Sequence, residues 1–357
     1  MKRLRPISIL ASCLLLSASA QAQISLAPPS AQTPPAASQP AAKPKAKPPA
    51  AAKNSAVHAA KPAAPAAAPT ATVTPAPVPD DPNVDLVFGA YQRGQYKTAF
   101  DLATKRAQDS GDPKAMTMLG ELYANAMGVK RDYAKAADWY KRAADGGDRE
   151  AMFALAMLRI AGRGGPVNHE EAAKLLASSA KLGNPKAAYN LALLYLDGQT
   201  LPQDLRRSAE LLRIAADAGS PEAQYALATF YKEGTGVPKD AEKAARLLQA
   251  ASLAGNVDAE VEYAIALFNG TGTPKNEAAA VALLRKAARQ NNPIAQNRLA
   301  RVLTNGTPAD RVEALKWHTI AKTAGKGDPE LDEVLAKLGP EDRAKADAAV
   351  RKWFGTK

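Results

Sequence analysis

The chain has 357 residues and a formal net charge of +12, from 47 Lys and Arg against 35 Asp and Glu. The excess lies near the start, because residues 1–79 contain eight bases and no acid, which leaves 39 bases against 35 acids in the remainder. This mixed surface argues against nucleic-acid binding, which usually requires a strongly basic domain. One Cys, three His and 5% aromatic residues leave few side chains for a metal site or a nucleophilic active site.

Residues 1–22 have the features of a secretory signal peptide. A basic start is followed by an apolar run from Ile7 to Leu16 and by a small-x-small site ending at Ala22, which predicts export and cleavage after Ala22. The run is too short to span a bilayer, so we expect a soluble periplasmic or secreted protein without a transmembrane segment in the mature chain. Cys13 ends a lipobox-like tetrapeptide, but the apolar run continues beyond it, which disfavours a lipid anchor.

Residues 23–82 contain 15 of the 27 prolines, and most other residues there are Ala, Lys, Ser or Thr. Such a segment cannot bury enough apolar surface to offset the entropy of ordering. We therefore predict a disordered Pro/Ala/Lys-rich linker with polyproline II character. Its simplest role is that of a spacer, and its lysines also permit contact with anionic envelope surfaces.

From Pro113 onward the sequence repeats itself every 36 residues. Alanine, leucine and glycine each return at a fixed place in successive copies. These places are Ala115, Ala151, Ala187, Ala223, Ala259 and Ala295; Leu119, Leu155, Leu191, Leu227 and Leu299; and Gly162, Gly198, Gly234, Gly270 and Gly306. A fixed period of this length is typical of a solenoid, in which each unit packs on its neighbours.

Each unit has the pattern of two helices. The first begins near a proline such as Pro113, whose missing N–H is not needed at a helix start, and continues with apolar residues at helical spacing. A glycine such as Gly128 ends it, and a second helix rich in Ala and Leu runs to a closing glycine such as Gly147. We predict an all-α fold, an α/α superhelical solenoid of helix-turn-helix repeats over residues 83–327, in which small Ala side chains allow close helix packing.

The first full unit resembles the Sel1-like repeat, a relative of the tetratricopeptide repeat with a longer loop between its helices. The matching residues are Leu119-Gly120-x-x-Tyr123, Gly128-Val129, Asp132 and Lys135-Ala136-x-x-Trp139-Tyr140-x-x-Ala143-Ala144-x-x-Gly147. The resemblance covers residues 84–327, about seven units, and implies a bacterial exported protein that binds other proteins. The first unit, around residues 90–96, and the last, after Gly306, have shorter loops than the others, as expected of capping units.

Residues 328–357 are predicted to form a C-terminal helical cap. Leu331, Leu335 and Leu338 belong to one short amphipathic helix, and a second helix begins near Glu341 and ends in Trp353-Phe354. The main interpretation is that this segment covers the last repeat. The alternative is that the two terminal aromatic residues dock a partner.

The sequence offers no set of residues for catalysis. Glycine-rich segments such as residues 162–165 recur with the repeat period and are therefore turns rather than phosphate loops. His58, His169 and His318 share no spacing suited to a metal site or to acid–base chemistry. We predict a non-enzymatic protein with no catalytic residue, no metal and no cofactor.

The candidate binding surface lies on the first helix of the central units. In the tetratricopeptide pattern, positions 5, 9 and 12 of this helix face the concave groove, and here they carry apolar residues at i, i+4 and i+7. The predicted binding residues are Phe153, Met157, Ile160, Tyr189, Leu193, Leu196, Tyr225, Val261, Ile265 and Phe268. Polar residues such as Glu121 and Arg301 hold these positions in the end units. Such a stripe is typical of a surface for an apolar peptide; the alternative is that superhelical closure buries it.

Together these features predict a protein–protein interaction scaffold or adaptor of the bacterial cell envelope, which binds a partner protein or peptide on the concave face. The resemblance leaves open a periplasmic regulator of exopolysaccharide production or of a sensor-kinase pathway. The partner would then be a membrane sensor kinase or an envelope assembly complex. An envelope hydrolase is the remotest alternative, because no acid, base and nucleophile converge. No nucleic acid is expected as a partner.

Overall fold

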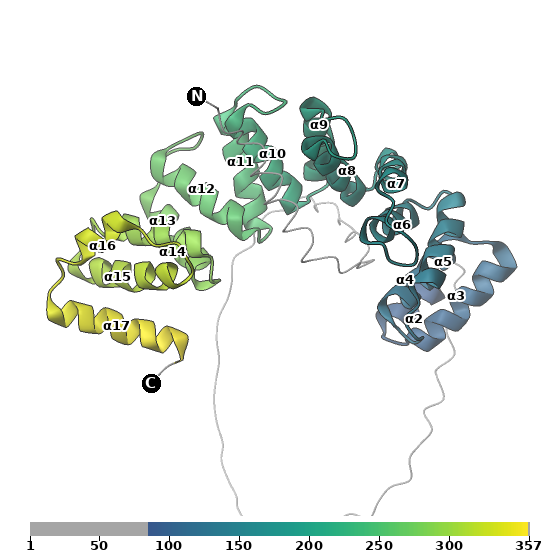
Figure 1. Ribbon diagram of the computed structural model, residues 1–357, viewed down its shortest axis with the longest axis horizontal. Helices are drawn as coiled ribbons and strands as arrows, with labels where there is room; N and C mark the ends of the chain where they lie inside the picture. Colours follow the sequence, from purple (N-terminus) through teal and green to yellow (C-terminus); the bar gives the residue numbers. More distant parts are fainter. Residues whose placement is uncertain (1–84, 356–357) are drawn as a thin grey trace, which may run out of the picture. The chain divides into compact units, whose positions relative to one another are not determined.

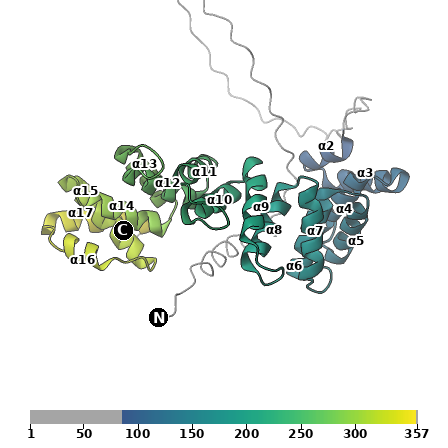
Figure 2. The ribbon, with the colours of Figure 1, turned by 90° about the horizontal axis from the view of Figure 1, so that it is seen from above.

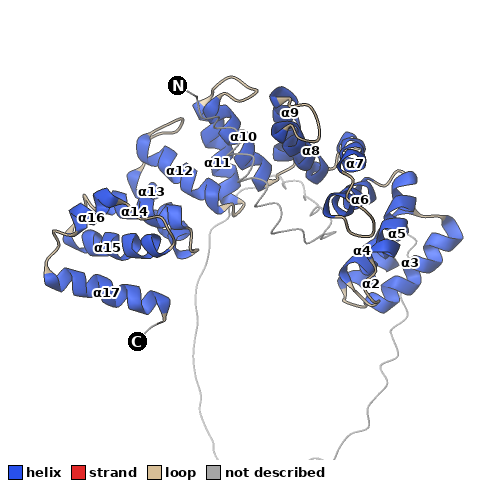
Figure 3. Cartoon of the chain, in the orientation of Figure 1, coloured by secondary structure: helices blue, strands red, loops and turns tan. Residues whose placement is uncertain are grey.

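The computed structural model describes residues 85–355, and within them it contains only helices and connecting loops (Figure 3). The predicted all-α repeat solenoid is confirmed. The predicted signal peptide (residues 1–22), the cleavage site after Ala22 and the linker (residues 23–82) lie outside the described residues, as does Cys13, where a lipid anchor was disfavoured.

Sixteen helices make up the regular structure of residues 85–355. They are α2 (Leu86–Gln92), α3 (Tyr96–Ser110), α4 (Pro113–Asn125), α5 (Tyr133–Asp145), α6 (Arg149–Ala161), α7 (His169–Lys181), α8 (Pro185–Asp197), α9 (Leu205–Asp217), α10 (Pro221–Glu233), α11 (Ala241–Leu253), α12 (Val257–Asn269), α13 (Glu277–Arg289), α14 (Pro293–Leu303), α15 (Pro308–Thr323), α16 (Pro329–Leu335) and α17 (Pro340–Phe354). No helix in this part of the chain is both long and apolar enough to cross a membrane.

Most helices that follow one another in the chain also lie side by side (Figures 1 and 2). They form pairs, such as α4 with α5 and α6 with α7, and each pair packs on the next. Extended contacts that skip a helix, as between α15 and α17, are the exception in residues 85–355. Each pair therefore depends mainly on its two neighbours, so stability is distributed along the array.

A capping residue recurs with the repeat period at the start of each first helix. The side chains of Asp112, Asp148, Asn184, Ser220, Asn256 and Asn292 each accept a hydrogen bond from a backbone N–H in the first turn. These bonds satisfy donors that have no partner within the helix. The sequence thus fixes where each first helix begins.

A glycine lets the loop of one repeat approach the second helix of the repeat before it. Gly236 has φ +66°, and a Cβ on it would lie 2.1 Å from the carbonyl oxygen of Leu205 at the start of α9. No side chain fits in that space, and left-handed backbone also favours glycine. In the α8–α9 loop, the equivalent position is occupied by Thr200.

The core consists of the periodic Leu and Ala side chains. Leu119, Leu155, Leu191, Leu227 and Leu299 are all buried. Tyr263, which replaces leucine in the α12 copy, is half-buried against the same clusters. Because the alanines opposite these leucines are small, adjacent helices pack closely over most of the array.

The C-terminal helices extend the period beyond the last full repeat. Pro329 and Leu335 lie 36 residues after Pro293 and Leu299, and Leu335 is buried, so α16 acts as a shortened first helix. Helix α17 packs on α15, where the rings of Trp353 and Trp317 meet edge to face at 5.1 Å. Trp353 therefore helps α17 to cover the last repeat, whereas the adjacent Phe354 is 51% exposed.

Candidate functional site

The ten predicted binding residues lie on the first helices α6, α8, α10 and α12. The structure divides them by burial. Tyr189, Leu193, Leu196 and Val261 are buried and belong to hydrophobic clusters. The three side chains of α8 are therefore part of the core and offer little surface to a partner.

The other six predicted residues keep part of their apolar surface accessible. They are Phe153, Met157, Ile160, Tyr225, Ile265 and Phe268, on α6, α10 and α12, and all are half-buried. Phe153 and Ile160 pack against the central hydrophobic cluster, and Ile265 and Phe268 pack against the C-terminal one. These four side chains are thus held in place by the core while one part of each stays exposed, as in preorganised binding surfaces.

Several polar groups on these first helices are paired or neutral. Lys232 Nζ of α10 lies 2.9 Å from Glu262 Oε2 of α12, which joins neighbouring first helices. The Thr229 hydroxyl donates to the Tyr225 carbonyl oxygen at 3.1 Å. Burial and, to a smaller extent, the negative charge of Glu222 raise the pKa of Tyr189 to about 12, so its phenol stays neutral near pH 7.

In the first full repeat the equivalent position holds a carboxyl group that the sequence did not single out as a site. The Glu121 side chain has 0% exposure. Asn125 Nδ2 donates to Glu121 Oε1 at 2.5 Å, and the Tyr140 hydroxyl donates to Oε2 at 3.1 Å. Burial raises the pKa of Glu121 to about 7, and the hydrogen bond from Tyr140 opposes this rise. The available sequence signal was that Gly120 replaces the Ala of the other units and Tyr140 replaces a residue that is Leu in four of them.

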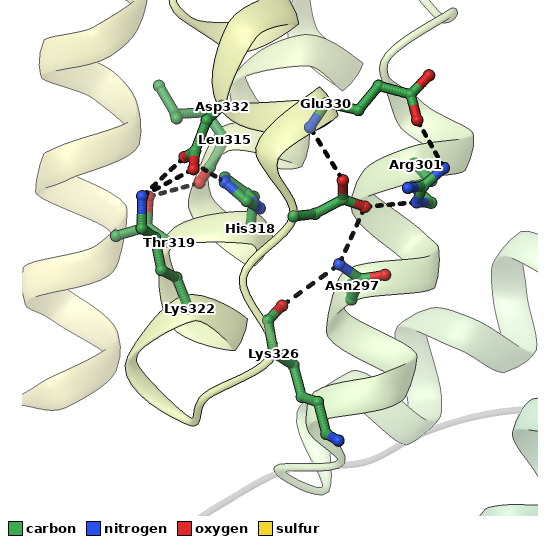
Figure 4. A network of polar contacts seen from close by, with 10 residues as sticks. Asn297, Arg301, Leu315, His318, Thr319, Lys322, Lys326, Glu330 and Asp332 are labelled. Carbon is green, nitrogen blue, oxygen red and sulfur yellow. Dashed lines mark hydrogen bonds and ion pairs between the residues drawn. The ribbon is translucent and has the colours of Figure 1, made fainter. Parts of the chain in front are cut away.

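In the last repeat the equivalent positions bind the C-terminal cap (Figure 4). Asn297 Nδ2 donates to the Lys326 carbonyl oxygen at 3.3 Å. Arg301 Nε lies 2.5 Å from Asp328 Oδ2, and Arg301 Nη1 lies 3.2 Å from Glu330 Oε2. These polar residues therefore serve the contact between repeats.

A second polar contact holds the cap, also shown in Figure 4. His318 is buried, and its Nε2 lies 2.8 Å from Asp332 Oδ1. Lys322 Nζ donates to both oxygens of Asp332 at 2.9 Å. His169, by contrast, is exposed at the start of α7. The two described histidines are thus in unrelated surroundings.

Other features of the described chain lie apart from the predicted residues. Within residues 85–355, no group of three or more His, Cys, Asp or Glu side chains is placed to hold a metal ion. An open depression of about 660 Å³ lies beside the α8–α9 loop. Its lining consists of Tyr195, Pro202, Gln203, Asp204, Leu205 and Arg207, which include none of the predicted binding residues.

Comparison with known proteins identifies the repeat. The Sel1 repeat family matches residues 113–148, 149–184, 185–220, 221–256, 257–292 and 293–326. A search of curated proteins gave no match.

The solved structures that are similar to this chain include the following two. One is a protective antigen present in uropathogenic Escherichia coli strains with an SLR fold: 26% identical, TM-score 0.64, over 72% of this chain and 57% of the antigen. This chain thus spans little more than half of that antigen's length. The other is a Sel1 repeat protein from Oxalobacter formigenes: 26% identical, TM-score 0.58, over 67% of this chain and 98% of that protein.

Proposed function

The chain belongs to the Sel1 repeat family, and we propose that it is a non-enzymatic scaffold of the cell envelope. In this proposal it binds a partner protein or peptide through the half-exposed apolar side chains of α6, α10 and α12. The predicted export signal supports the location in the periplasm or outside the cell. The absence of convergent catalytic groups in the sequence supports a role in binding rather than in chemistry.

One observation supports the proposal: the apolar residues at the predicted groove positions of α6, α10 and α12 keep part of their surface exposed. Phe153, Tyr225, Ile265 and Phe268 pack against buried clusters yet keep part of their surface exposed, and Met157 is also half-buried. A side chain needed only for stability would gain more by complete burial. Accessible apolar side chains on rigid helices are what a protein or peptide partner would bury.

The partner's identity separates the alternatives retained from the sequence. A membrane sensor kinase would make the protein a periplasmic regulator, for example of exopolysaccharide production. An envelope assembly complex would make it an adaptor. Peptidoglycan fragments that are cleaved during the assay would instead favour a hydrolase, which the residues support least.

The decisive experiment compares two double variants in capture from envelope extract, with each captured protein identified and then tested for binding in purified form. Phe153→Ser with Met157→Ser, and Ile265→Ser with Phe268→Ser, remove half-exposed apolar groups from the inner positions. Ile214→Ser is the matched control, because Ile214 is 48% exposed on the second helix α9. We expect capture to fall at least tenfold in a double variant and to persist in the control.

Folding is checked on the same proteins by helicity and thermal unfolding. A double variant that keeps its unfolding midpoint within a few degrees and loses the partner supports the proposal. Loss of capture in Ile214→Ser, with both double variants still binding, would place the partner on the second helices and contradict it.

A further inference from the structure

The first full repeat contains a buried acid without a charged hydrogen-bond donor. Glu121 of α4 has 0% exposure, and its two donors, Asn125 and Tyr140, are both uncharged. The contrasting case is Glu260 of α12, which is 1% exposed but forms an ion pair with Lys286. A buried carboxylate held only by neutral donors is costly to ionise.

Three departures from the repeat pattern together build this contact. The other units have Ala where Gly120 stands, four of them have Leu where Tyr140 stands, and none has an acid where Glu121 stands. A Cβ at position 120 would lie 2.5 Å from the Tyr140 ring, so the glycine makes room for the phenol. The Tyr140 hydroxyl then reaches the Glu121 carboxyl. Because the other units pack without these residues, the repeat fold itself does not require this contact.

Several titratable groups face this carboxyl from the surrounding helices. Tyr91 of α2 and Tyr140 of α5 both have a raised pKa, first from burial and then from the negative charge of Glu121. Lys186 of α8 has the opposite influence, because its positive charge lowers the pKa of Glu121. Burial is the larger effect on Glu121, and the neutral carboxyl is favoured when α4 and α5 are packed.

We propose that Glu121, Tyr140 and Gly120 form a proton-linked contact that holds the first repeat together while Glu121 is protonated and loosens it once Glu121 is ionised. The N-terminal end of the array is then more stable against local unfolding at mildly acidic pH than at mildly alkaline pH. Protonation of Glu121 is thus coupled to the packing of α4 on α5. Helix α3 packs on α4 in turn.

The direction of the effect follows from proton linkage. The pKa of Glu121 is about 7 in the packed repeat, against 4.5 for the exposed group. Between these values, opening the repeat releases a proton, so opening becomes easier by at most about tenfold for each pH unit. The contribution to stability is complete below about pH 4.5, is lost as pH rises towards 7, and does not change further above 7.

The test is hydrogen–deuterium exchange of α4 and α5 peptides in the full chain between pH 5 and 8.5, corrected for the intrinsic pH dependence of exchange. In the unaltered protein, protection should fall between pH 5 and 7 and then level off. In Glu121→Gln, whose amide imitates the neutral carboxyl, protection should be independent of pH and higher than in the unaltered protein at pH 8. Glu260→Gln is the matched control and should keep the pH trend of α4 and α5.

A second variant keeps the test decisive if Glu121→Gln folds poorly. Tyr140→Phe removes a donor to the ionised carboxyl and so raises the pKa of Glu121 in the packed repeat, which should extend the fall in protection to higher pH and raise its midpoint. An unchanged pH trend in Glu121→Gln, or an unchanged midpoint in Tyr140→Phe, overturns the proposal.

Discussion

The ring of Tyr140 on α5 lies directly against Gly120 on α4, in space that a side chain at position 120 would otherwise fill. A Cβ at position 120 would lie 2.5 Å from Tyr140 Cδ1 and Cε1. In four other repeats alanine replaces the glycine and leucine replaces the tyrosine, as in Ala156 with Leu176. The small residue on one helix and the large residue on the next are therefore matched in volume.

Gly120→Ala is expected to destabilise the protein by about 1–3 kcal/mol, because the added methyl group overlaps the Tyr140 ring. In a Tyr140→Leu background the same change should be nearly neutral or stabilising, since it recreates the pair found in other repeats. A double-mutant cycle by urea unfolding measures the coupling. Equal losses in both backgrounds would show that the two residues do not share this space.

Leu191→Ala should cost about 2–5 kcal/mol, because Leu191 is a buried core residue of α8. Leu193→Ser should also destabilise clearly, since Leu193 is buried and its replacement leaves a cavity with a hydroxyl group. Chemical unfolding followed by circular dichroism provides the measurement. A loss below about 0.5 kcal/mol for Leu193→Ser would mean that its side chain lies on an open surface.

Trp353→Ala and Phe354→Ala separate a covering role of α17 from a docking role. Trp353 packs on Trp317 at 5.1 Å, with Lys316 Nζ over both rings, so its removal should cost about 2 kcal/mol. Phe354 is 51% exposed, and its removal should change stability by less than about 0.5 kcal/mol. Unfolding experiments on both variants decide between these roles. Equal stability of the two variants would argue against α17 as a cap.

Acid should weaken the attachment of α16 to the last repeat. Burial opposes ionisation of Asp328, but the hydrogen bond and positive charge of Arg301 outweigh it and lower the pKa of Asp328 below 3.8. A lowered pKa gives stability that is present above about pH 4 and is lost as pH falls through the folded-state value. Asp328→Asn should therefore reduce stability at pH 7 and weaken the acid dependence between pH 4 and 2. Asp347→Asn, at an exposed site of α17, is the control and should leave both unchanged.

The sequence by itself determined the fold and the register of its elements. Alanine and leucine returning every 36 residues, with proline or a capping residue such as Asp148 at the helix start, are local signals that require no knowledge of distant contacts. Because each repeat packs mainly on its neighbours, this local information was sufficient to specify the whole array. The same period identified the positions at which a binding surface was expected.

Only the tertiary structure decided which of those positions remain accessible. Leu193 and Ile265 stand at the same place in their repeats, yet Leu193 is buried and Ile265 is half-buried. The exposure of a side chain depends on the volumes of residues on adjacent helices, and these vary between repeats without altering the period. Glu121 was missed for the same reason: its carboxyl accepts a hydrogen bond from Tyr140 only because the space beside Gly120 admits the phenol. Periodicity thus specifies the backbone, and packing between neighbouring helices decides the chemistry of each position.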